Sequence, residues 1–242
     1  MAIGNVTPDS FYAGSRLMNG DARIDTSRVV AWAKQALADG ADILDIGACS
    51  TRPGSTPASE QEEWRRLVPA LEAIRTSLPD AQLSIDTFRP AVAKQAINRF
   101  GSLIINDISG GSKEMYDLVS QYGVPYIFTF AGDYTRLSIL STRDTAHWIL
   151  DPGFGFCGGV DRDYECLRRM DALRIYNRPV LVGVSRKSMI YKPLGLTPET
   201  CLAPTQALQL YALEHGATIL RTHDVRDTKS IVELWNKINC KL

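Results

Sequence analysis

The sequence has no long hydrophobic run, since none of its apolar stretches approaches the roughly 18 residues that a membrane-spanning helix needs. Residues 1–5 carry no positively charged region and no apolar block of the kind found in signal peptides. Cysteine is sparse, with five residues and no C-x-x-C pair, which argues against a disulfide framework and against a zinc site. We therefore predict no membrane contact, no export and a reducing cytoplasm as the location.

An excess of charge of either sign is also missing. Lys and Arg total 27, as do Asp and Glu, so the formal net charge is zero. This balance excludes a generally basic nucleic-acid-binding protein and a strongly acidic tail. The hydrophobic share of 45% is typical of a folded protein rather than a disordered one. No linker or low-complexity segment interrupts the chain, so residues 1–242 are predicted to form a single domain.

What the sequence does contain is a repeat of short apolar runs separated by longer amphipathic stretches. Several runs are dense in Ile and Val, which is typical of strands buried on both faces. Eight runs in 242 residues give units of about 30 residues, the size of a βα unit. The predicted strands are residues 2–6, 42–46, 83–85, 103–105, 124–130, 148–150, 179–184 and 218–220.

The stretches between the runs have helical periodicity. In the first of them, apolar residues recur at positions 29, 30, 33, 36 and 37. Either Thr26 or Ser27 is expected to cap this helix, and Ser59 with Glu62 is expected to cap the next one. The predicted helices with the clearest patterns are residues 27–38, 60–78, 204–213 and 230–238.

This alternation of strand and helix predicts a parallel sheet of the α/β class. The length and the number of units favour a (β/α)8 TIM barrel, with an open doubly wound sheet as the alternative. One unit is weak, because residues 131–146 are rich in Ser and Thr and have no helical stripe. We therefore predict a single-domain TIM barrel with a shortened fifth βα unit.

Polar side chains follow the predicted strands, where the active site of a parallel barrel collects. One set offers carboxylates, an amide and an amine. Carboxylates accept hydrogen bonds from amino and ring N–H groups, and an amine donates to a carbonyl. The set therefore suits a planar heterocycle with an aminopyrimidinone edge. Its members are Asp86, Asn106, Asp151 and Lys187.

A second set offers cationic groups and hydroxyls. Guanidinium groups and hydroxyls are common ligands of phosphate, so this set suits a phosphate or a diphosphate. Its members are Thr51, Arg52, Ser188, Arg221 and His223. Asn5 and Asp9 could in addition hold a hard cation through their oxygens.

Simpler interpretations stand beside these assignments. Asp86 could cap a helix, and Asp151, which precedes a proline, could form a turn. Arg52, Arg221 and Lys187 could be solvated surface residues, and His223 could pack structurally. Polar turns commonly follow strands, so a polar residue at any one strand end needs no functional explanation. That interpretation does not explain why these residues form two sets, one suited to a heterocycle and one suited to a phosphate.

Seven motifs resemble those of the dihydropteroate synthase family of pterin-binding barrels. They occur in the family's order and extend from residue 5 to residue 225. No single motif is decisive, whereas seven in register are very specific. The motifs are NVTPDSF at 5–11, DIG at 45–47 with STRPG at 50–54, SIDT at 84–87, INDI at 105–108, DPGFGF at 151–156, GVSRKS at 183–188 and LRTHDV at 220–225.

The resemblance implies an enzyme that joins a pterin diphosphate to p-aminobenzoate with release of diphosphate. It implies a pterin site of Asp86, Asn106, Asp151 and Lys187, and a diphosphate site of Thr51, Arg52, Arg221 and His223. It also implies a p-aminobenzoate site shaped by Phe156, Lys187, Ser188 and the loop that carries Thr51. The residues that the resemblance makes catalytic are Asp86, Lys187, Arg221 and His223. It further implies Mg²⁺ at Asn5 and a homodimer.

Some positions depart from the family's usual pattern. Residues 128–130 read Phe-Thr-Phe where Met-His-Met is usual, and Asp163 stands where Asn is usual. Gly158 and Gly159 occupy positions where a Lys is common. These departures motivate an alternative, a catalytically impaired or non-catalytic pterin-binding paralogue. A pterin methyltransferase is the second alternative. It has no diphosphate to bind, so the predicted anion site argues against it.

Overall fold

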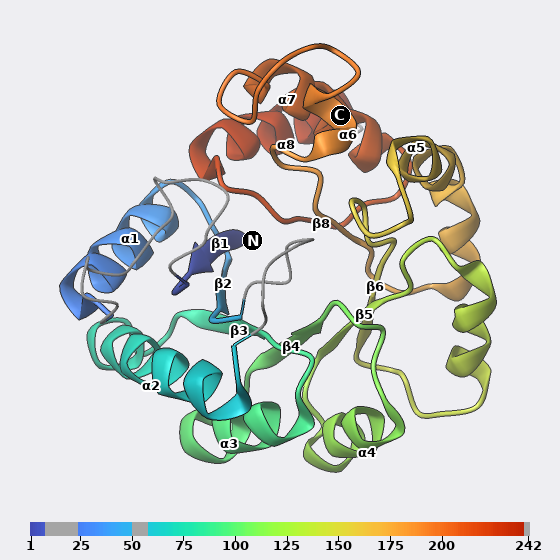
Figure 1. The fold of residues 1–242 in the computed structure, drawn as a ribbon. Helices are drawn as coiled ribbons and strands as arrows, with labels where there is room; N and C mark the ends of the chain where they lie inside the picture. Colours follow the sequence, from blue (N-terminus) through green and yellow to red (C-terminus); the bar gives the residue numbers. More distant parts are fainter. Residues whose placement is uncertain (8–23, 50–57, 240–242) are drawn as a thin grey trace. The chain divides into compact units, whose positions relative to one another are not determined.

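The computed structural model describes residues 1–7, 24–49 and 58–239 (Figure 1). The chain divides into two compact units. The first contains Met1–Asp107 and Gly111–Tyr126, and the second contains Ile108–Gly110 and Ile127–Leu242. No helix among the described residues combines the length and the apolar character that crossing a membrane requires. That residues 1–242 form a single domain stays a prediction.

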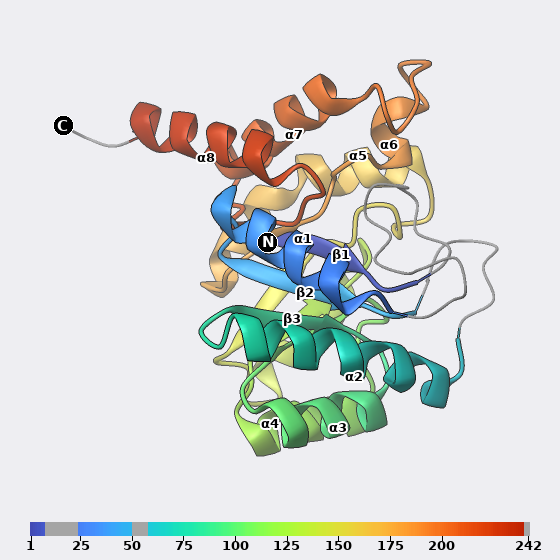
Figure 2. The same cartoon turned by 90° about the vertical axis from the view of Figure 1, so that its left-hand side faces the viewer.

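The first unit is a run of parallel strands that alternate with helices. Its strands are β1 (Ala2–Asn5), β2 (Ile43–Gly47), β3 (Gln82–Asp86) and β4 (Ile104–Asp107), and they pair in chain order. Its helices are α1 (Thr26–Ala38), α2 (Glu60–Ser77), α3 (Pro90–Phe100) and α4 (Lys113–Tyr122). In Figure 2, α1 and α2 lie side by side along these strands.

Apolar burial explains why these strands form where the sequence predicts them. Leu44, Asp45 and Ile46 of β2 are all fully buried, as are Leu83, Ser84 and Ile85 of β3, although successive residues of a strand point to opposite faces. One face is covered by helices, whose inward residues include Leu71 of α2. Strands buried on both sides are typical of a parallel α/β sheet.

The helix caps confirm one prediction and correct another. Ser59 caps α2, because its Oγ accepts a hydrogen bond from the backbone N of Glu62 at 3.2 Å. The predicted cap of α1, Thr26 or Ser27, is wrong: Asp25 is the cap, and its Oδ1 accepts from the backbone N of Arg28 at 3.0 Å. Thr26 is the first helical residue, so the helix begins one position earlier than its apolar stripe indicates.

The second unit continues the alternation with shorter strands. Its strands are β5 (Tyr126–Thr129, of which Tyr126 ends the first unit), β6 (Trp148–Asp151), β7 (Leu181–Val182) and β8 (Ile219–Leu220). Its helices are η2 (Tyr134–Ser141), α5 (Val160–Arg168), η3 (Met170–Tyr176), α6 (Ser188–Tyr191), α7 (Leu202–Glu214) and α8 (Val225–Asn239). β7 and β8 are parallel, and a parallel bridge joins Leu150 of β6 to Val180.

All eight predicted strands are present, and the fifth connection is short as predicted. Its only helix is the 3₁₀ helix η2, which begins after Asp133 and contains a single buried residue, Leu137. A segment with so little apolar surface to bury gains little by forming an α-helix against a sheet. The seventh strand is shorter than predicted, because only Leu181–Val182 of residues 179–184 pair as strand.

Candidate active site

Three predicted site residues lie in one row at the ends of the strands of the first unit. Asn5 of β1 is opposite Gly47 of β2, Gly47 is opposite Asp86 of β3, and Asp86 is opposite Asn106 of β4. Gly47 has no side chain, and a Cβ placed there would be 3.6 Å from both Asn5 Oδ1 and Asp86 Oδ2. The amide oxygen and the carboxylate therefore share the space above Gly47.

A buried network fixes the side chain of Asn106. Its Nδ2 donates to Asp45 Oδ2 at 3.0 Å, and Ser84 Oγ donates to Asp45 Oδ1 at 2.6 Å. Because the amide nitrogen is used in this way, the oxygen of Asn106 is the atom left to accept a hydrogen bond from a ligand. The sequence analysis missed Asp45 and Ser84. The available signal was a polar residue inside an otherwise apolar run.

Asp151 ends β6 in the second unit, and its carboxylate is held on both oxygens. Thr129 Oγ1 donates to Oδ2 at 2.9 Å, and the backbone N of Gly153 donates to Oδ1 at 2.9 Å. Burial raises the pKa of Asp151, while nearby Lys187 and Arg221 act in the opposite direction. The turn-forming interpretation is thus confirmed locally, and the same turn presents a fixed hydrogen-bond acceptor.

Lys187 lies in the same unit and contacts the loop that follows Asp151. Its Nζ donates to the carbonyl of Phe154 and lies 5.2 Å from the centre of the Phe156 ring. Burial, with a smaller contribution from the charge of Arg221, lowers the pKa of Lys187 to about 8, although the charge of Asp151 opposes the change. The surface-lysine interpretation is wrong, because the amine is enclosed among charged neighbours.

Arg221 and His223 follow β8. A Cβ on Gly183 would be 3.7 Å from Arg221 Cβ and 3.9 Å from Lys187 Nζ, so both cationic side chains flank Gly183. The backbone N of His223 donates to Ser185 Oγ at 3.2 Å. Burial, with the charge of Arg221, lowers the pKa of His223 to about 4. The imidazole is therefore neutral at pH 7 and can donate one N–H without carrying a charge.

Arg186 is a residue that the sequence analysis missed. Its guanidinium donates to both oxygens of Asp224, at 2.9 and 2.7 Å, and to the carbonyl of Pro198 at 2.6 Å. Its φ is 54°, a left-handed conformation that costs energy for a residue with a side chain. These bonds tie the loop before α6 to the loop before α8, which positions Lys187 and His223.

The remaining predicted residues are placed less fully. Ser188 is the first residue of α6 and is half-buried. Phe156, in the loop that follows β6, is 40% exposed. Thr51, Arg52 and Asp9 lie outside the described residues.

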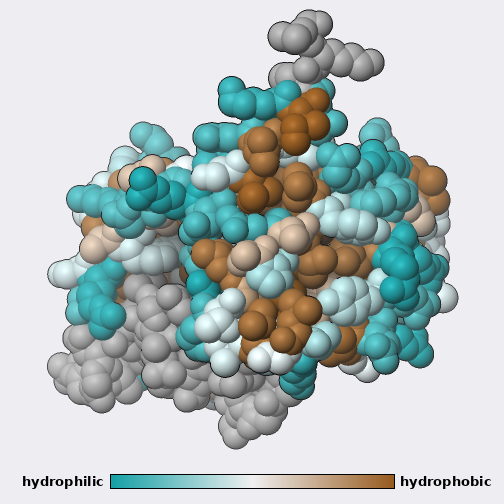
Figure 3. Space-filling view, turned by 90° about the horizontal axis from the view of Figure 1, so that it is seen from above, coloured by the Kyte–Doolittle hydropathy of each residue, from teal (hydrophilic) through white to brown (hydrophobic). Residues whose placement is uncertain are grey.

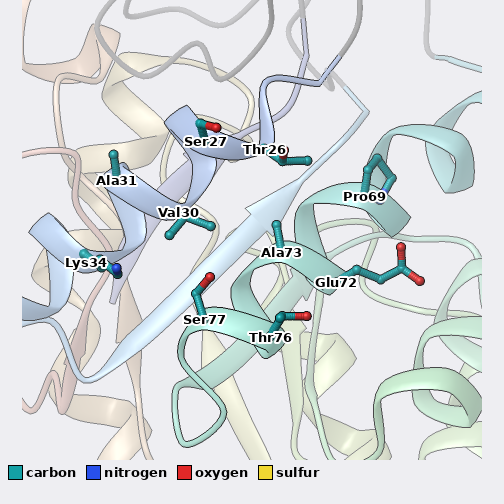
Figure 4. Close-up of a pocket in the computed structure, with 10 residues that line it drawn as sticks. All are labelled: Thr26, Ser27, Val30, Ala31, Lys34, Pro69, Glu72, Ala73, Thr76 and Ser77. Carbon is teal, nitrogen blue, oxygen red and sulfur yellow. The ribbon is translucent and has the colours of Figure 1, made fainter.

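A pocket elsewhere in the first unit is not this site. It has a volume of about 710 Å³ and lies between α1 and α2 (Figure 4). Every lining residue comes from one of these two helices, among them Val30, Lys34, Pro69 and Glu72. No strand end and no predicted site residue contributes to it.

The chain is similar to known proteins over nearly its whole length. A profile described as pterin binding enzyme matches residues 1–147 and 143–223. A dihydropteroate synthase of Streptococcus pyogenes is 32% identical over 98% of this chain and 94% of its own length. The chain belongs to the pterin-binding enzyme family.

The backbone of this chain is also similar to that of dihydropteroate synthases of known structure. A dihydropteroate synthase of Clostridium difficile, crystallised in the presence of pteroic acid, has a TM-score of 0.87 at 30% identity. The match covers 99% of this chain and 96% of that one. The Xanthomonas albilineans enzyme with 4-aminobenzoic acid also has a TM-score of 0.87, at 31% identity over 100% and 93% of the two chains. The predicted fold class, a (β/α)8 TIM barrel, is confirmed.

Two departures from the family's usual residues have a structural role here. Thr129, in place of the usual His, donates to Asp151. Asp163, in place of the usual Asn, accepts a hydrogen bond from the backbone N of Gly155 at 2.8 Å. Both substitutions keep the loop that follows Asp151 anchored.

Proposed function

We propose that the chain is a dihydropteroate synthase. It condenses 6-hydroxymethyl-7,8-dihydropterin diphosphate with p-aminobenzoate to give 7,8-dihydropteroate and diphosphate, in folate biosynthesis. The observation that carries the proposal is the carboxylate of Asp151, fixed as an acceptor and accompanied by the ammonium group of Lys187. A pterin edge presents amino and ring N–H donors beside a carbonyl, which this pair complements.

The first unit supplies acceptors of the same kind. We assign Asp86 and the oxygen of Asn106 to N–H donors of the pterin, on the basis of the SIDT and INDI motifs and of the network around Asp45. Asp86 has a second role. The methylene carbon becomes electron-poor as diphosphate leaves, and a carboxylate close to the pterin stabilises that positive charge.

The chemistry needs a good leaving group more than a strong base. The arylamine nitrogen attacks the methylene carbon, the bond from that carbon to the diphosphate oxygen breaks, and the amine proton passes to solvent. We assign Arg221 and His223, with Thr51 and Arg52, to the diphosphate. The guanidinium groups neutralise the charge that grows on the leaving oxygen, and His223 donates an N–H from a neutral ring.

The residues present fit a magnesium ion. Asn5 Oδ1 and Asp86 Oδ2 face the same space above Gly47, and Mg²⁺ binds proteins through one or two such oxygens together with substrate phosphates. We propose Asn5 as the residue that holds it. When bound, the ion would stabilise the negative charge on the diphosphate.

We assign the arylamine site to Phe156, Lys187, Ser188 and the loop of Thr51. The exposed ring of Phe156 lies over Lys187 Nζ and offers an apolar surface to the aromatic ring of p-aminobenzoate. The ammonium group of Lys187 and the hydroxyl of Ser188 are suited to its carboxylate.

A diphosphate-release assay tests the proposed function against its alternatives. The protein is incubated with the pterin diphosphate, p-aminobenzoate and Mg²⁺, and diphosphate is measured with and without the arylamine. We expect release that requires both substrates and stops on chelation of the metal. A paralogue that has lost catalysis would bind the pterin and release none. A methyltransferase would bind pterin with no preference for the diphosphate form.

We also propose that the protein is a homodimer, through the face formed by α7 and α8. Figure 3 shows apolar side chains gathered on this face. Leu234 and Ile238, one helical turn apart on α8, are 49% and 64% exposed. α7 has apolar residues on all sides, a pattern typical of a helix that is buried all round. A second copy of the chain, related by two-fold symmetry, would cover both helices.

Charge on this face is expected to separate the protomers. Leu234→Glu with Ile238→Glu should shift the mass measured by light scattering from dimer to monomer, because two carboxylates cannot be buried unpaired. Ile175→Glu on η3 is the matched control, since Ile175 is 79% exposed and lies outside α7 and α8. A monomeric parent protein, or a variant that stays dimeric, would contradict the proposal.

We propose the cytoplasm as the location. Cys157, Cys166 and Cys201 form no disulfide among the described residues. Unoxidised thiols are typical of a reducing compartment.

A further inference from the structure

Four buried polar side chains of the second unit form a hydrogen-bonded polar network at the end of β8. They come from the loop after β7, from the end of β8 and from the helices α7 and α8, and they are between 1% and 6% exposed (Figure 1). A polar group buried this deeply costs free energy unless it is hydrogen-bonded, so each one needs a partner inside the protein. The four residues of the polar network are Ser185, Gln209, Thr222 and Thr228.

The polar network is a chain in which each side chain donates to the next. Gln209 Nε2 donates to Thr228 Oγ1 at 3.0 Å, and Thr228 Oγ1 donates to Thr222 Oγ1 at 2.9 Å. Thr222 Oγ1 donates in turn to Ser185 Oγ at 3.4 Å. Successive hydrogen bonds that run in one direction polarise and strengthen one another. The chain therefore joins both helices to the loops that follow β7 and β8.

The polar network also takes over from the sheet as the partner of the backbone beyond β8. The backbone N of Arg221 still donates to a carbonyl of β7 at 2.9 Å, as in a parallel strand. The backbone N of His223 donates instead to Ser185 Oγ at 3.2 Å. The backbone N of Asp224 donates to Thr222 Oγ1 at 3.1 Å. Two hydroxyls of the network thus hold the backbone that carries His223.

The hydroxyl of Thr222 lies at the centre of these bonds. It accepts from Thr228 Oγ1 and from the backbone N of Asp224, and it donates to Ser185 Oγ. These three bonds use its one donor and its two acceptor positions. Valine has nearly the shape of threonine and would fill the same space, but it would leave the partners unsatisfied. Packing alone does not require a hydroxyl here, whereas holding the backbone does.

We propose that the polar network positions the residues that bind the diphosphate. It fixes the backbone of residues 221–224, which carries the side chains of Arg221 and His223. The inference rests on the proposed function, because it takes these two side chains as ligands of the leaving group. Groups that are held in place before the ligand arrives bind it without the cost of being ordered.

The contacts assigned to the pterin ring are held by other bonds. Asp151 is fixed by Thr129 and by the backbone of Gly153, and neither residue belongs to the polar network. Breaking the network should therefore weaken binding of the diphosphate more than binding of the pterin ring. A general loss of structure in the second unit would weaken both.

Thr222→Val tests the proposal by removing the central hydroxyl. We expect the Kd for the pterin diphosphate, measured by calorimetry, to rise about tenfold, since small displacements of positioning groups have effects of this size. The Kd for 6-hydroxymethylpterin should change far less. Thr228→Val should have the same selectivity with a smaller effect, because Thr228 bonds to Thr222 and not to the backbone of residues 221–224. Thr228→Ser keeps the hydroxyl and should restore the affinity.

Thr205→Val is the matched control. Thr205 lies on α7 and is 1% exposed, and its Oγ1 donates to the carbonyl of Cys201 at 2.8 Å, one turn earlier in the chain. The variant removes a buried hydroxyl of the same kind from the same unit and leaves the polar network in place. We expect its melting temperature to fall as in Thr228→Val and its Kd for the pterin diphosphate to stay at the parental value. Equal weakening in the two variants would overturn the proposal, because the effect would then be one of stability.

Amide hydrogen exchange reports on the backbone without any ligand. The N–H groups of His223 and Asp224 should be protected in the parent protein, because both are bonded to buried hydroxyls. They should exchange faster in Thr222→Val and in Thr228→Val, and at the parental rate in Thr205→Val. Unchanged protection in both network variants would overturn the positioning role, whether or not the enzyme is active.

The outcomes separate this inference from the proposed function. A parent protein that neither binds the pterin diphosphate nor releases diphosphate would refute the proposed function. Inorganic diphosphate is then the probe of the anion site, and Thr222→Val should weaken its binding to the same extent. Faster amide exchange with unchanged binding of every diphosphate ligand would overturn the link between the polar network and the anion site. Equal losses for the pterin with and without diphosphate would do the same.

Discussion

Replacing Asp151 by alanine is expected to weaken binding of a pterin at least about tenfold, a cost of roughly 1–3 kcal/mol for donors left without a partner. The carboxylate is held by Thr129 and Gly153, so it meets the ligand without reorganising. Its loss would also leave Lys187 without a counter-charge that partly offsets burial. Isothermal calorimetry with 6-hydroxymethylpterin measures the change directly.

The control for this variant keeps the carboxylate and removes one of its donors. Thr129→Val leaves Asp151 with the Gly153 bond, so pterin affinity should fall much less than in Asp151→Ala. Asp86→Ala makes the same test in the first unit, with Asp107→Asn as its control, because Asp107 is a buried acid bonded to Tyr126. Unchanged calorimetric affinity in both alanine variants would show that the pterin assignment is wrong. Thermal melting of each variant separates lost binding from lost folding.

The elements of the fold were predictable because strand burial leaves a local signal. A parallel strand covered on both faces is a short run of Ile, Val and Leu, as in residues 83–85 or 103–105. The cap at Asp25 was less visible, since three polar residues in succession, Asp25, Thr26 and Ser27, all have side chains that can cap a helix. For the seventh strand the sequence predicts too many residues. The apolar run covers residues 179–184, whereas only Leu181 and Val182 form the strand.

The positions of the candidate site residues at the strand ends were predictable from the sequence, whereas the contacts of the side chains that support them were not. Asp45 and Ser84 are 39 residues apart and meet only because β2 and β3 pair in register. Arg186 and Asp224, 38 residues apart, meet through two loops. No spacing in the sequence indicates such pairs.

Arg221→Ala is expected to weaken binding of the pterin diphosphate by roughly ten- to a hundredfold, because a charge-assisted hydrogen bond to an anion is worth about 1.5–3 kcal/mol. Binding of a pterin without phosphates should change far less. The Arg221 side chain flanks Gly183 together with Lys187, so its removal leaves the bonds that hold Asp151 in place. Calorimetry with both ligands gives the ratio of the two losses, which is the quantity predicted.

His223→Ala should show the same selectivity with a smaller loss. Because the pKa of His223 is lowered to about 4, the free protein has a neutral imidazole at pH 7 and contributes a hydrogen bond but no charge. A bound dianion favours the protonated ring and so raises this pKa toward its ordinary value. Proton uptake on binding should therefore be greatest midway between the pKa of the free protein, about 4, and the raised pKa of the complex, and it should disappear in His223→Ala.

Arg226→Ala is the matched control for both variants, since Arg226 is an exposed cation at the start of α8. It removes the same net charge from the same unit, so any general electrostatic attraction of the diphosphate falls equally in Arg226→Ala and Arg221→Ala. Only a directed contact produces a larger loss at Arg221. Equal losses for the two arginines, or equal losses for the two ligands in Arg221→Ala, would mean that Arg221 supports the fold and does not bind the leaving group.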